Sequence, residues 1–312
     1  MGRWVIYGIL LLFYCTEAQA QSLVLTPKWT AQAQFAGYYA AEELGFYKDE
    51  GLDLQIAHVT IGESSFSCLQ EGRAQVVVMN LSYALTARHN GAKLVNIMQT
   101  SQINSLMLVT RTPIKDIATL RHRKIAVWNH LGNELLDMLN RRYDLDAEWI
   151  HFNSGVNLFL SGAVDVCLVG SYNEFPQLAE FGMNIDSTCI FRLSDQGYDL
   201  PEDGLYVTEE FYQLHSELIP KIVKASIRGW QWTNEHREQA LDIVMERVKE
   251  GNIGTNRYHQ RVMLEEILRL QQDKQAGVPT YRLSREGFNR AIQGLFPSKE
   301  DLSGITYESF VK

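Results

Sequence analysis

Aromatic, amide and carboxylate side chains follow several short apolar segments of this chain, and these segments have the length of β-strands. An indole in such a place can stack on a flat heteroaromatic ring, which contributes about 0.5–1.5 kcal/mol beyond the area buried. A carboxylate there can accept a charge-assisted hydrogen bond from an exocyclic amine, worth roughly 1.5–3 kcal/mol. The combination predicts a binding site for a small heteroaromatic molecule. The candidate residues are Trp29, Tyr39, Asn80, Ser82, Trp128, Asn129, Asn173, Glu174 and Asp199.

Most of these candidates also have an interpretation without a ligand. Trp29 could also be a core side chain, which periodicity alone does not exclude. Asn80 and Ser82 stand at the start of a predicted helix and could cap it. Glu174 is an acid in the first turn of a predicted helix, where the macrodipole favours it. A ligand role is compatible with that position, because clefts in open α/β sheets lie at helix N-termini.

Two groups of adjacent residues require a choice. Tyr38 and Tyr39 point about a third of a turn apart on a helix, so only one should face a cleft, and we select Tyr39. Trp128 and Asn129 are preferred to the neighbouring His130, because a lone histidine in such a loop is more often a surface residue.

The sequence lacks the common catalytic motifs. The sequence contains no GxSxG, HExxH or P-loop pattern. The cysteines beyond the first twenty residues, Cys68, Cys167 and Cys189, are odd in number and show no CxxC spacing. We therefore predict no catalytic residue, no metal and no cofactor.

Strand and helix patterns alternate over the first two thirds of the chain. This rhythm predicts mostly parallel sheets with helices on both faces. The final third, residues 216–296, is almost entirely helical, with apolar residues at spacings of three and four. Strands are expected at 23–25, 52–56, 76–79, 94–98, 124–128, 149–150 and 164–169, and helices at 34–44, 63–72, 81–90, 134–143 and 156–160.

The alternation divides into two α/β units followed by the helical tail, which we expect to pack back on the first unit. Lobe one is predicted to comprise residues 21–109 and 205–312, and lobe two residues 110–204. The chain would cross between the lobes near 108–112 and 200–206. Two crossings make a hinge, and the crevice between the lobes is where a ligand would bind.

The first twenty residues have the pattern of a signal peptide. Arg3 precedes an apolar stretch at 5–14 that is too short to span a bilayer, and 18–20 fits a small-residue cleavage site. An uncleaved membrane anchor is the alternative. Lipidation at Cys15 is disfavoured, because bulky side chains precede it. We predict an exported, periplasmic protein with signal peptide 1–20.

Composition restricts the partners. The 312 residues carry a net charge of −8 and are 46% hydrophobic, which is typical of a globular protein with a substantial core. A negative chain offers no basic surface to nucleic acid or to an anionic membrane. A monomer is the expected state for a two-lobed protein that must close.

Several segments occur in the order of one known family. The stretch from Trp29 to Leu52 contains a tryptophan, a polar loop, Ala-Gly-Tyr-Tyr and then Gly-Phe-Tyr-Lys-Asp-Glu-Gly-Leu. It resembles the substrate-binding proteins of ABC importers for the pyrimidine precursor of thiamine, a family shared with thiamine-pyrimidine synthases. The resemblance covers roughly residues 23–250. Further similar segments are 116–126, 160–165, Gly170-Ser171-Tyr172-Asn173-Glu174, 197–199 and Gly229-Trp230.

The resemblance implies a type II-like periplasmic-binding-protein fold, with two α/β lobes, a two-strand hinge and a helical C-terminal part on lobe one. It also implies a stacking role for Trp29, a thiamine-related pyrimidine as ligand and an ABC transporter permease as partner. Departures at Phe35, where the synthases carry a histidine, and at 122–123 leave the identity of the ligand open.

Two other functions remain possible. One is a periplasmic ligand sensor that reports to a separate signalling kinase. The other is a synthase-like enzyme, in which Lys28 would form a Schiff base with pyridoxal phosphate.

Overall fold

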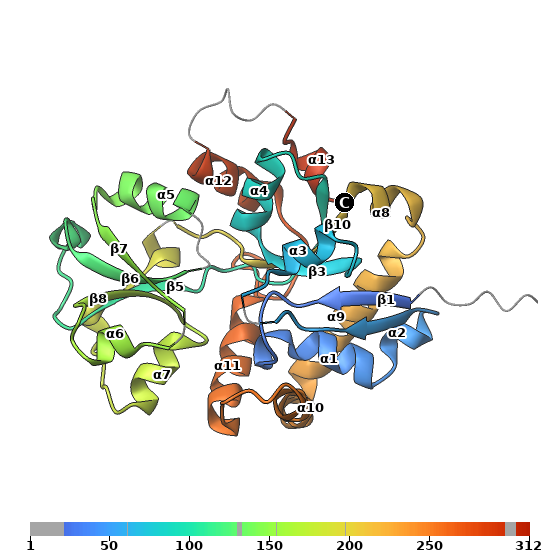
Figure 1. Cartoon of the computed structure of the whole chain (residues 1–312), viewed down its shortest axis with the longest axis horizontal. Helices are drawn as coiled ribbons and strands as arrows, with labels where there is room; N and C mark the ends of the chain where they lie inside the picture. The colour runs from blue at the N-terminus through green and yellow to red at the C-terminus, as the bar shows by residue number, and fades with distance from the viewer. Residues whose placement is uncertain (1–21, 61, 130–132, 154, 197, 297–303) are drawn as a thin grey trace, which may run out of the picture.

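Two five-stranded β-sheets form the centres of two lobes (Figure 1). The structure is a computed structural model and describes residues 22–60, 62–129, 133–153, 155–196, 198–296 and 304–312. The first sheet has the strand order β2-β1-β3-β10-β4 and the second β7-β6-β8-β5-β9. The strands are β1 (Ser22–Thr26), β2 (Asp53–Ile56), β3 (Val76–Asn80), β4 (Leu94–Gln99), β5 (Leu106–Thr110), β6 (Lys124–Trp128), β7 (Glu148–Phe152), β8 (Val166–Gly170), β9 (Ile190–Arg192) and β10 (Asp203–Thr208).

Each sheet combines parallel strands with strands that run the other way. In the first sheet β1 is parallel to β2 and β3, whereas β10 is antiparallel to β3 and β4. In the second sheet β6 is parallel to β7 and β8, whereas β5 is antiparallel to β8 and β9. The parallel strands match the predicted ones closely. The sequence pattern missed β5, β9 and β10.

Helices cover both sheets, so the predicted fold class is confirmed. The first lobe carries α1 (Ala36–Glu43), α2 (Phe46–Asp49), α3 (Ser65–Gln70) and α4 (Leu81–His89), and the second α5 (Asn133–Tyr143), α6 (Asn157–Leu160) and α7 (Glu174–Glu180). The later helices are α8 (Glu209–Leu214), α9 (Ile219–Glu235), α10 (Arg237–Glu250), α11 (Arg257–Leu270), α12 (Arg285–Leu295) and α13 (Tyr307–Phe310).

The first crossing between the lobes lies earlier than the sequence indicated. The chain leaves the first sheet after β4 and enters the second at β5, so the crossing is 100–105 rather than 108–112. A short continuous apolar run does not by itself distinguish a buried strand from another buried segment, so β5 was taken for part of the crossing. The return at 198–202 agrees better with the expected 200–206. The two crossing segments are joined by hydrogen bonds from the Asn104 backbone N–H to Asp199 (3.1 Å) and from the Asn104 side chain to the Leu200 carbonyl (3.2 Å).

The helical tail packs on the first lobe mainly through α9, which lies against α1. Glycines make this approach possible. A Cβ on Gly229 would lie 2.0 Å from the Gly37 carbonyl oxygen, and a Cβ on Gly37 would lie 2.2 Å from the Trp230 ring. Trp230 is fully buried and meets Tyr38 edge to face, with ring centroids 5.5 Å apart. Trp230 therefore has a packing role.

The tail also touches the second lobe, which the sequence did not indicate. Helix α12 lies between α4 of the first lobe and α5 of the second, and α11 contacts α7 (Figure 1). Helices of the tail thus join the two lobes through α12 and through α11.

The predicted signal peptide, 1–20, lies outside the described residues. Within the described part of the chain, the helices lack the length and apolar character needed to cross a bilayer.

Candidate functional site

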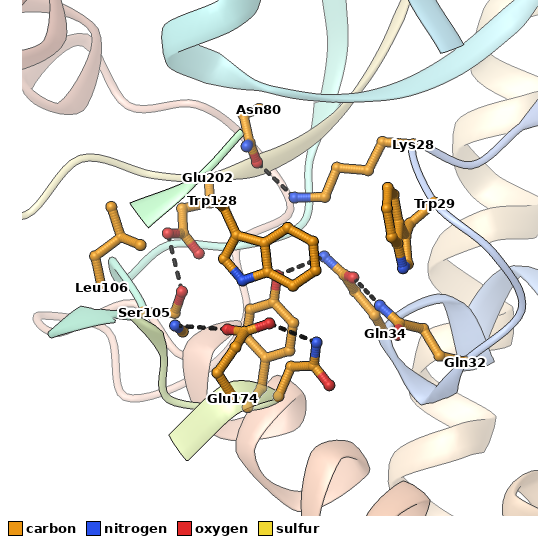
Figure 2. A pocket seen from close by; sticks show the side chains of 13 residues that line it. Lys28, Trp29, Gln32, Gln34, Asn80, Ser105, Leu106, Trp128, Glu174 and Glu202 are labelled. Atoms are coloured by element: carbon orange, nitrogen blue, oxygen red, sulfur yellow. Dashed lines mark hydrogen bonds between the residues drawn. The ribbon is translucent and has the colours of Figure 1, made fainter. Parts of the chain in front are cut away.

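A cavity of about 140 Å³ lies between the lobes, and we call it the inter-lobe cavity. It opens where parallel strands of both sheets end, because β1, β3, β6 and β8 all deliver lining residues from their carboxyl ends. The crossing segments complete it from the hinge side. Its lining residues are Lys28, Trp29, Gln32, Gln34, Asn80, Ser105, Leu106, Trp128, Gly170, Tyr172, Asn173, Glu174 and Glu202 (Figure 2).

Each lobe contributes one tryptophan to the cavity. Trp29 follows β1, and Trp128 is the last residue of β6. Their ring centroids are 5.6 Å apart at an interplanar angle of 80°, an edge-to-face contact across the cleft. Phe152 supports Trp128 from behind, at 5.0 Å. Because the indoles belong to different lobes, this contact depends on the lobes being closed.

The position of Trp29 is held by residues outside the cavity. The backbone carbonyl of Trp29 lies 2.7 Å from Nδ1 of His58, and Nε2 of His58 lies 2.9 Å from the Tyr39 hydroxyl. Burial lowers the pKa of His58, which favours the neutral imidazole in this chain of contacts. Tyr39 is fully buried and does not line the cavity, so the structure does not bring this predicted contact to the site.

Glu174 is the buried carboxylate of the second lobe. It is 5% exposed, and its oxygens accept hydrogen bonds from the Gly170 backbone N–H (2.9 Å) and the Asn173 side-chain amide (2.6 Å). Burial raises the pKa of Glu174, while these hydrogen bonds and one from the Trp128 side chain oppose the shift. The carboxylate is therefore fixed in place and directed at the cavity that Trp128 also lines.

A histidine from the other lobe holds Asn173. Nε2 of the buried His259, on α11, lies 3.0 Å from the Asn173 side-chain oxygen. Nδ1 of His259 lies 2.6 Å from the carboxylate of Glu180, at the end of α7. The side chain of Ser171 also donates a hydrogen bond to Glu266 of α11. These polar contacts connect the first lobe to the turn that carries Glu174.

The first-lobe wall of the cavity contains an ion pair. The Lys28 ammonium lies 2.5 Å from Asp203 and donates a hydrogen bond of 2.6 Å to the Asn80 side-chain oxygen. The second oxygen of Asp203 accepts a hydrogen bond of 2.6 Å from Gln34. Lys28 is thus held by a carboxylate and an amide, and Asn80 faces the cavity as predicted by its place at the end of β3.

Glu202 is a lining residue that sequence reasoning missed. It stands on the returning crossing segment and accepts a hydrogen bond of 3.0 Å from the hydroxyl of Ser105, on the other crossing. Burial raises the pKa of Glu202 to about 7, Asp203 adds to the shift, and Lys28 and the Ser105 hydrogen bonds oppose it. The expected crossing at 200–206 included this acid, so its position could have been noticed.

The remaining predicted residues lie away from the cavity lining. Ser82 is half-buried in the first turn of α4, behind Asn80. Asn129 is exposed and donates a hydrogen bond of 3.1 Å to Asn153. Asp199 accepts from the Asn104 backbone and pairs with Lys274 at 2.8 Å, so it joins the hinge to the tail. The candidates that do line the cavity are Trp29, Asn80, Trp128, Asn173 and Glu174.

The charges around the cavity are predominantly negative. Glu174 and Glu202 line it, and Asp203 lies against its only lining cation within the described residues, Lys28. Among the residues placed by the structure, no group of three or more histidine, cysteine or acidic side chains could hold a metal ion.

The two lobes and the cavity between them have the architecture of the periplasmic-binding-protein fold. The chain belongs to the NMT1/THI5-like family, whose model matches residues 32–240.

Curated relatives cover most of the chain at low identity. The putative binding protein YtlA of Bacillus subtilis is 23% identical, with 78% of each chain covered. The riboflavin-binding protein RibY of Chloroflexus aurantiacus is 22% identical, covering 79% of this chain and 72% of its own length. The formylaminopyrimidine-binding protein of Halalkalibacterium halodurans is 23% identical, with 72% and 70% covered.

Solved structures share the fold. A protein from Bordetella bronchiseptica superposes with a TM-score of 0.69 at 18% identity, covering 93% of this chain and 94% of its own. The periplasmic aliphatic sulphonate-binding protein SsuA of Escherichia coli gives a TM-score of 0.61 at 15% identity, with 83% and 89% covered.

Proposed function

We propose that this chain is the exported, periplasmic solute-binding component of an ABC importer and that it captures a small amine-bearing heteroaromatic ring of the thiamine-pyrimidine class. It carries out no reaction in this proposal. The observation that carries it is the placement of Trp29, Trp128 and the buried Glu174 around one cavity. Indoles can contact the faces and edges of a flat ring, and the carboxylate can accept from its amine.

The size of the cavity supports a single ring. A cavity of about 150 Å³ in another protein holds benzene, which is close to the 140 Å³ found here. A pyrimidine with small substituents is of this size. A three-ring isoalloxazine such as riboflavin, which the name of the Chloroflexus relative specifies, would require the lobes to stand further apart.

The charge of the cavity supports an amine over an anion. A sulfonate, the ligand class in the name of the Escherichia coli protein, would meet Glu174 and Glu202 with Lys28 already paired to Asp203. Where these acids are ionised they repel a sulfonate, and the low dielectric of a closed cleft strengthens the repulsion. An aminopyrimidine offers N–H donors to the same carboxylates.

The same residues fit poorly with pyridoxal phosphate, the cofactor of the synthase branch implied by the resemblance. Its phosphate would lie among the cavity carboxylates, and Lys28 is engaged by Asp203 and Asn80. Phe35, where a histidine would be expected, is completely buried in the core of the first lobe. We therefore derive no reaction through that cofactor.

The proposal is tested by titrating the purified chain, from Gln21 onward, with 4-aminopyrimidines while following tryptophan fluorescence and melting temperature. A ligand that binds only the folded state adds about 2.7 kcal/mol of stability at a hundredfold excess over Kd. We expect a saturable change that is lost in Trp29→Ala and Glu174→Ala.

Trp232→Phe is the matched control, because it removes an indole that packs on the first-lobe core away from the cavity. It should keep both responses. Binding of alkanesulfonates in place of aminopyrimidines would contradict the proposed ligand class.

A further inference from the structure

Glu202 reaches the inter-lobe cavity from the hinge itself. It lies between the returning crossing and β10, whose first residue, Asp203, pairs in register with Asn80 at the end of β3. On the other crossing, Ser105 precedes β5 and holds the Glu202 carboxylate through its hydroxyl at 3.0 Å. Both Ser105 and Glu202 line the cavity. The acid is therefore placed by the two segments that connect the lobes.

Glu202 and Glu174 lie on the same side of the cavity. Figure 2 shows Glu202, Ser105 and Glu174 along one side, with Trp29 and Gln34 on the other. Gly170 lies beside Glu174 and the serine that binds Glu202: a Cβ there would be 3.2 Å from a Glu174 oxygen and 3.6 Å from the Ser105 hydroxyl. The missing side chain leaves room for a ligand edge to approach both carboxylates.

The Lys28 ammonium, which also lines the cavity, is bound by residues other than Glu202. Lys28 is held by Asp203 at 2.5 Å and by Asn80 at 2.6 Å. Ser105 supplies hydrogen-bond donors to Glu202, and a carboxylate has lone pairs for about four donors. A half-buried acid that faces a cavity is stabilised when an incoming ligand supplies a further donor.

We propose that Glu202 forms a second polar subsite, which binds a hydrogen-bond donor of the ligand distinct from the amine held by Glu174. This inference rests on the proposed function and deepens it. The favoured ligands are single heteroaromatic rings that carry two donor groups, an amine and a neighbouring hydroxyl or amide N–H. A ring with the amine alone would fill the cavity but leave Glu202 with its protein partner only.

The test compares two probes that differ in the second donor, 4-amino-5-(hydroxymethyl)pyrimidine and 4-amino-5-methylpyrimidine. Calorimetric titration of the purified protein at pH 8, where Glu202 is mostly ionised, should show the hydroxymethyl compound binding at least about tenfold more tightly, as expected for a hydrogen bond to a charged group. In Glu202→Met the ratio of the two affinities should fall close to one. Glu174→Gln should weaken both probes by a similar factor and preserve their ratio.

Control and alternative variants keep the test decisive. Glu210→Met changes an exposed acid on α8 and should keep the wild-type ratio. If Glu202→Met does not fold, as judged by its melting transition, Glu202→Gln replaces it. The amide oxygen still accepts from Ser105 but carries no charge, so the ratio of the two affinities should fall severalfold rather than to one. With either variant, an unchanged ratio between two probes that both bind would overturn the subsite and leave the proposed function standing. If neither pyrimidine binds the wild-type protein, the proposed function fails and the subsite fails with it.

Discussion

The two places where helices join the lobes differ in chemistry. At one, α12 packs between α4 and α5, and the residues there belong to a continuous apolar cluster that includes Leu139 of α5 and Leu295 of α12. At the other, α11 meets α7 through His259, Glu180 and other polar groups. Separating an apolar contact exposes its surface to water, which costs free energy. Separating a polar contact costs less, because water replaces the hydrogen bonds that are lost.

This difference indicates how the molecule opens. The α12–α5 contact should stay closed and keep the lobes together on its side, whereas the α11–α7 contact should separate when the cleft admits a ligand. Asn173 belongs to the polar contact and also donates to Glu174, so closing and the placement of the ligand-binding carboxylate occur together.

The largest expected effect comes from weakening the apolar contact. Met138 of α5 is 5% exposed and lies against Gly294 of α12, and Met138→Ala should lower the free energy of unfolding by about 2–5 kcal/mol, through lost burial and the cavity left behind. Urea denaturation measures this change. Leu214→Ala, at a position 66% exposed, is the control and should change stability little. A loss as small as that of the control would show that the α12–α5 side is not a stable contact.

A second prediction concerns the hinge between the two contacts. Burial raises the pKa of Glu202 to about 7, above the value near 4.3 in an unfolded chain. The folded state therefore binds more protons between these values, and stability falls as pH rises from about 4 to 7. Glu202→Gln removes this loss, so it should stabilise the protein relative to wild type by about 1–3 kcal/mol at pH 8 and much less at pH 5.

Melting temperatures of both proteins at the two pH values provide the measurement. The charged and titratable groups that act on Glu202 are Lys28 after β1, Asp203 on β10, Tyr172 after β8 and Tyr198 on the returning crossing. Burial raises the pKa of both tyrosines far above this range, so neither titrates in it. A difference between variant and wild type that is the same at pH 5 and pH 8 would contradict the assignment.

The polar contact should influence affinity more than stability. His259→Ala leaves Asn173 and Glu180 without their partner in the closed state, whereas water satisfies them in the open state. We expect ligand affinity to fall about tenfold, with a smaller change in unfolding free energy than Met138→Ala produces. The matched control is His215→Ala, a histidine at the end of α8 that takes no part in the α11–α7 contact. If His259→Ala affected only stability, the polar contact would not control closing.

The local hydrophobic pattern was enough to predict the part of the site that follows the parallel strands. The strands that end near Trp29, Asn80 and Trp128 were found from their apolar runs, and the residues after them face the cavity. Glu202 and His259 were not found in this way. Glu202 directly precedes the antiparallel strand β10, and His259 lies on the C-terminal helix α11. Their neighbours are distant in sequence, and periodicity holds no information on such contacts.

Orientation was predicted less well than position. Tyr39 and Asn129 were placed near the right elements, yet neither lines the cavity. Successive side chains at a strand end alternate in direction, so once Trp128 faces the cleft, Asn129 must face outward. Which of two neighbours faces a ligand depends on the packing of the whole lobe.

The smallest expected effect uses two asparagines of the second lobe that the sequence treats alike. Asn129 is exposed and bound to Asn153, whereas Asn173 lines the cavity and donates to Glu174 at 2.6 Å. Asn129→Ala should therefore change ligand affinity by no more than about twofold, as for other surface substitutions. Asn173→Ala removes a donor that stabilises the Glu174 carboxylate and should weaken binding about tenfold. A tenfold loss of affinity in both variants would contradict this difference. It would mean that the occupied cleft extends past Trp128 to the outer end of β6.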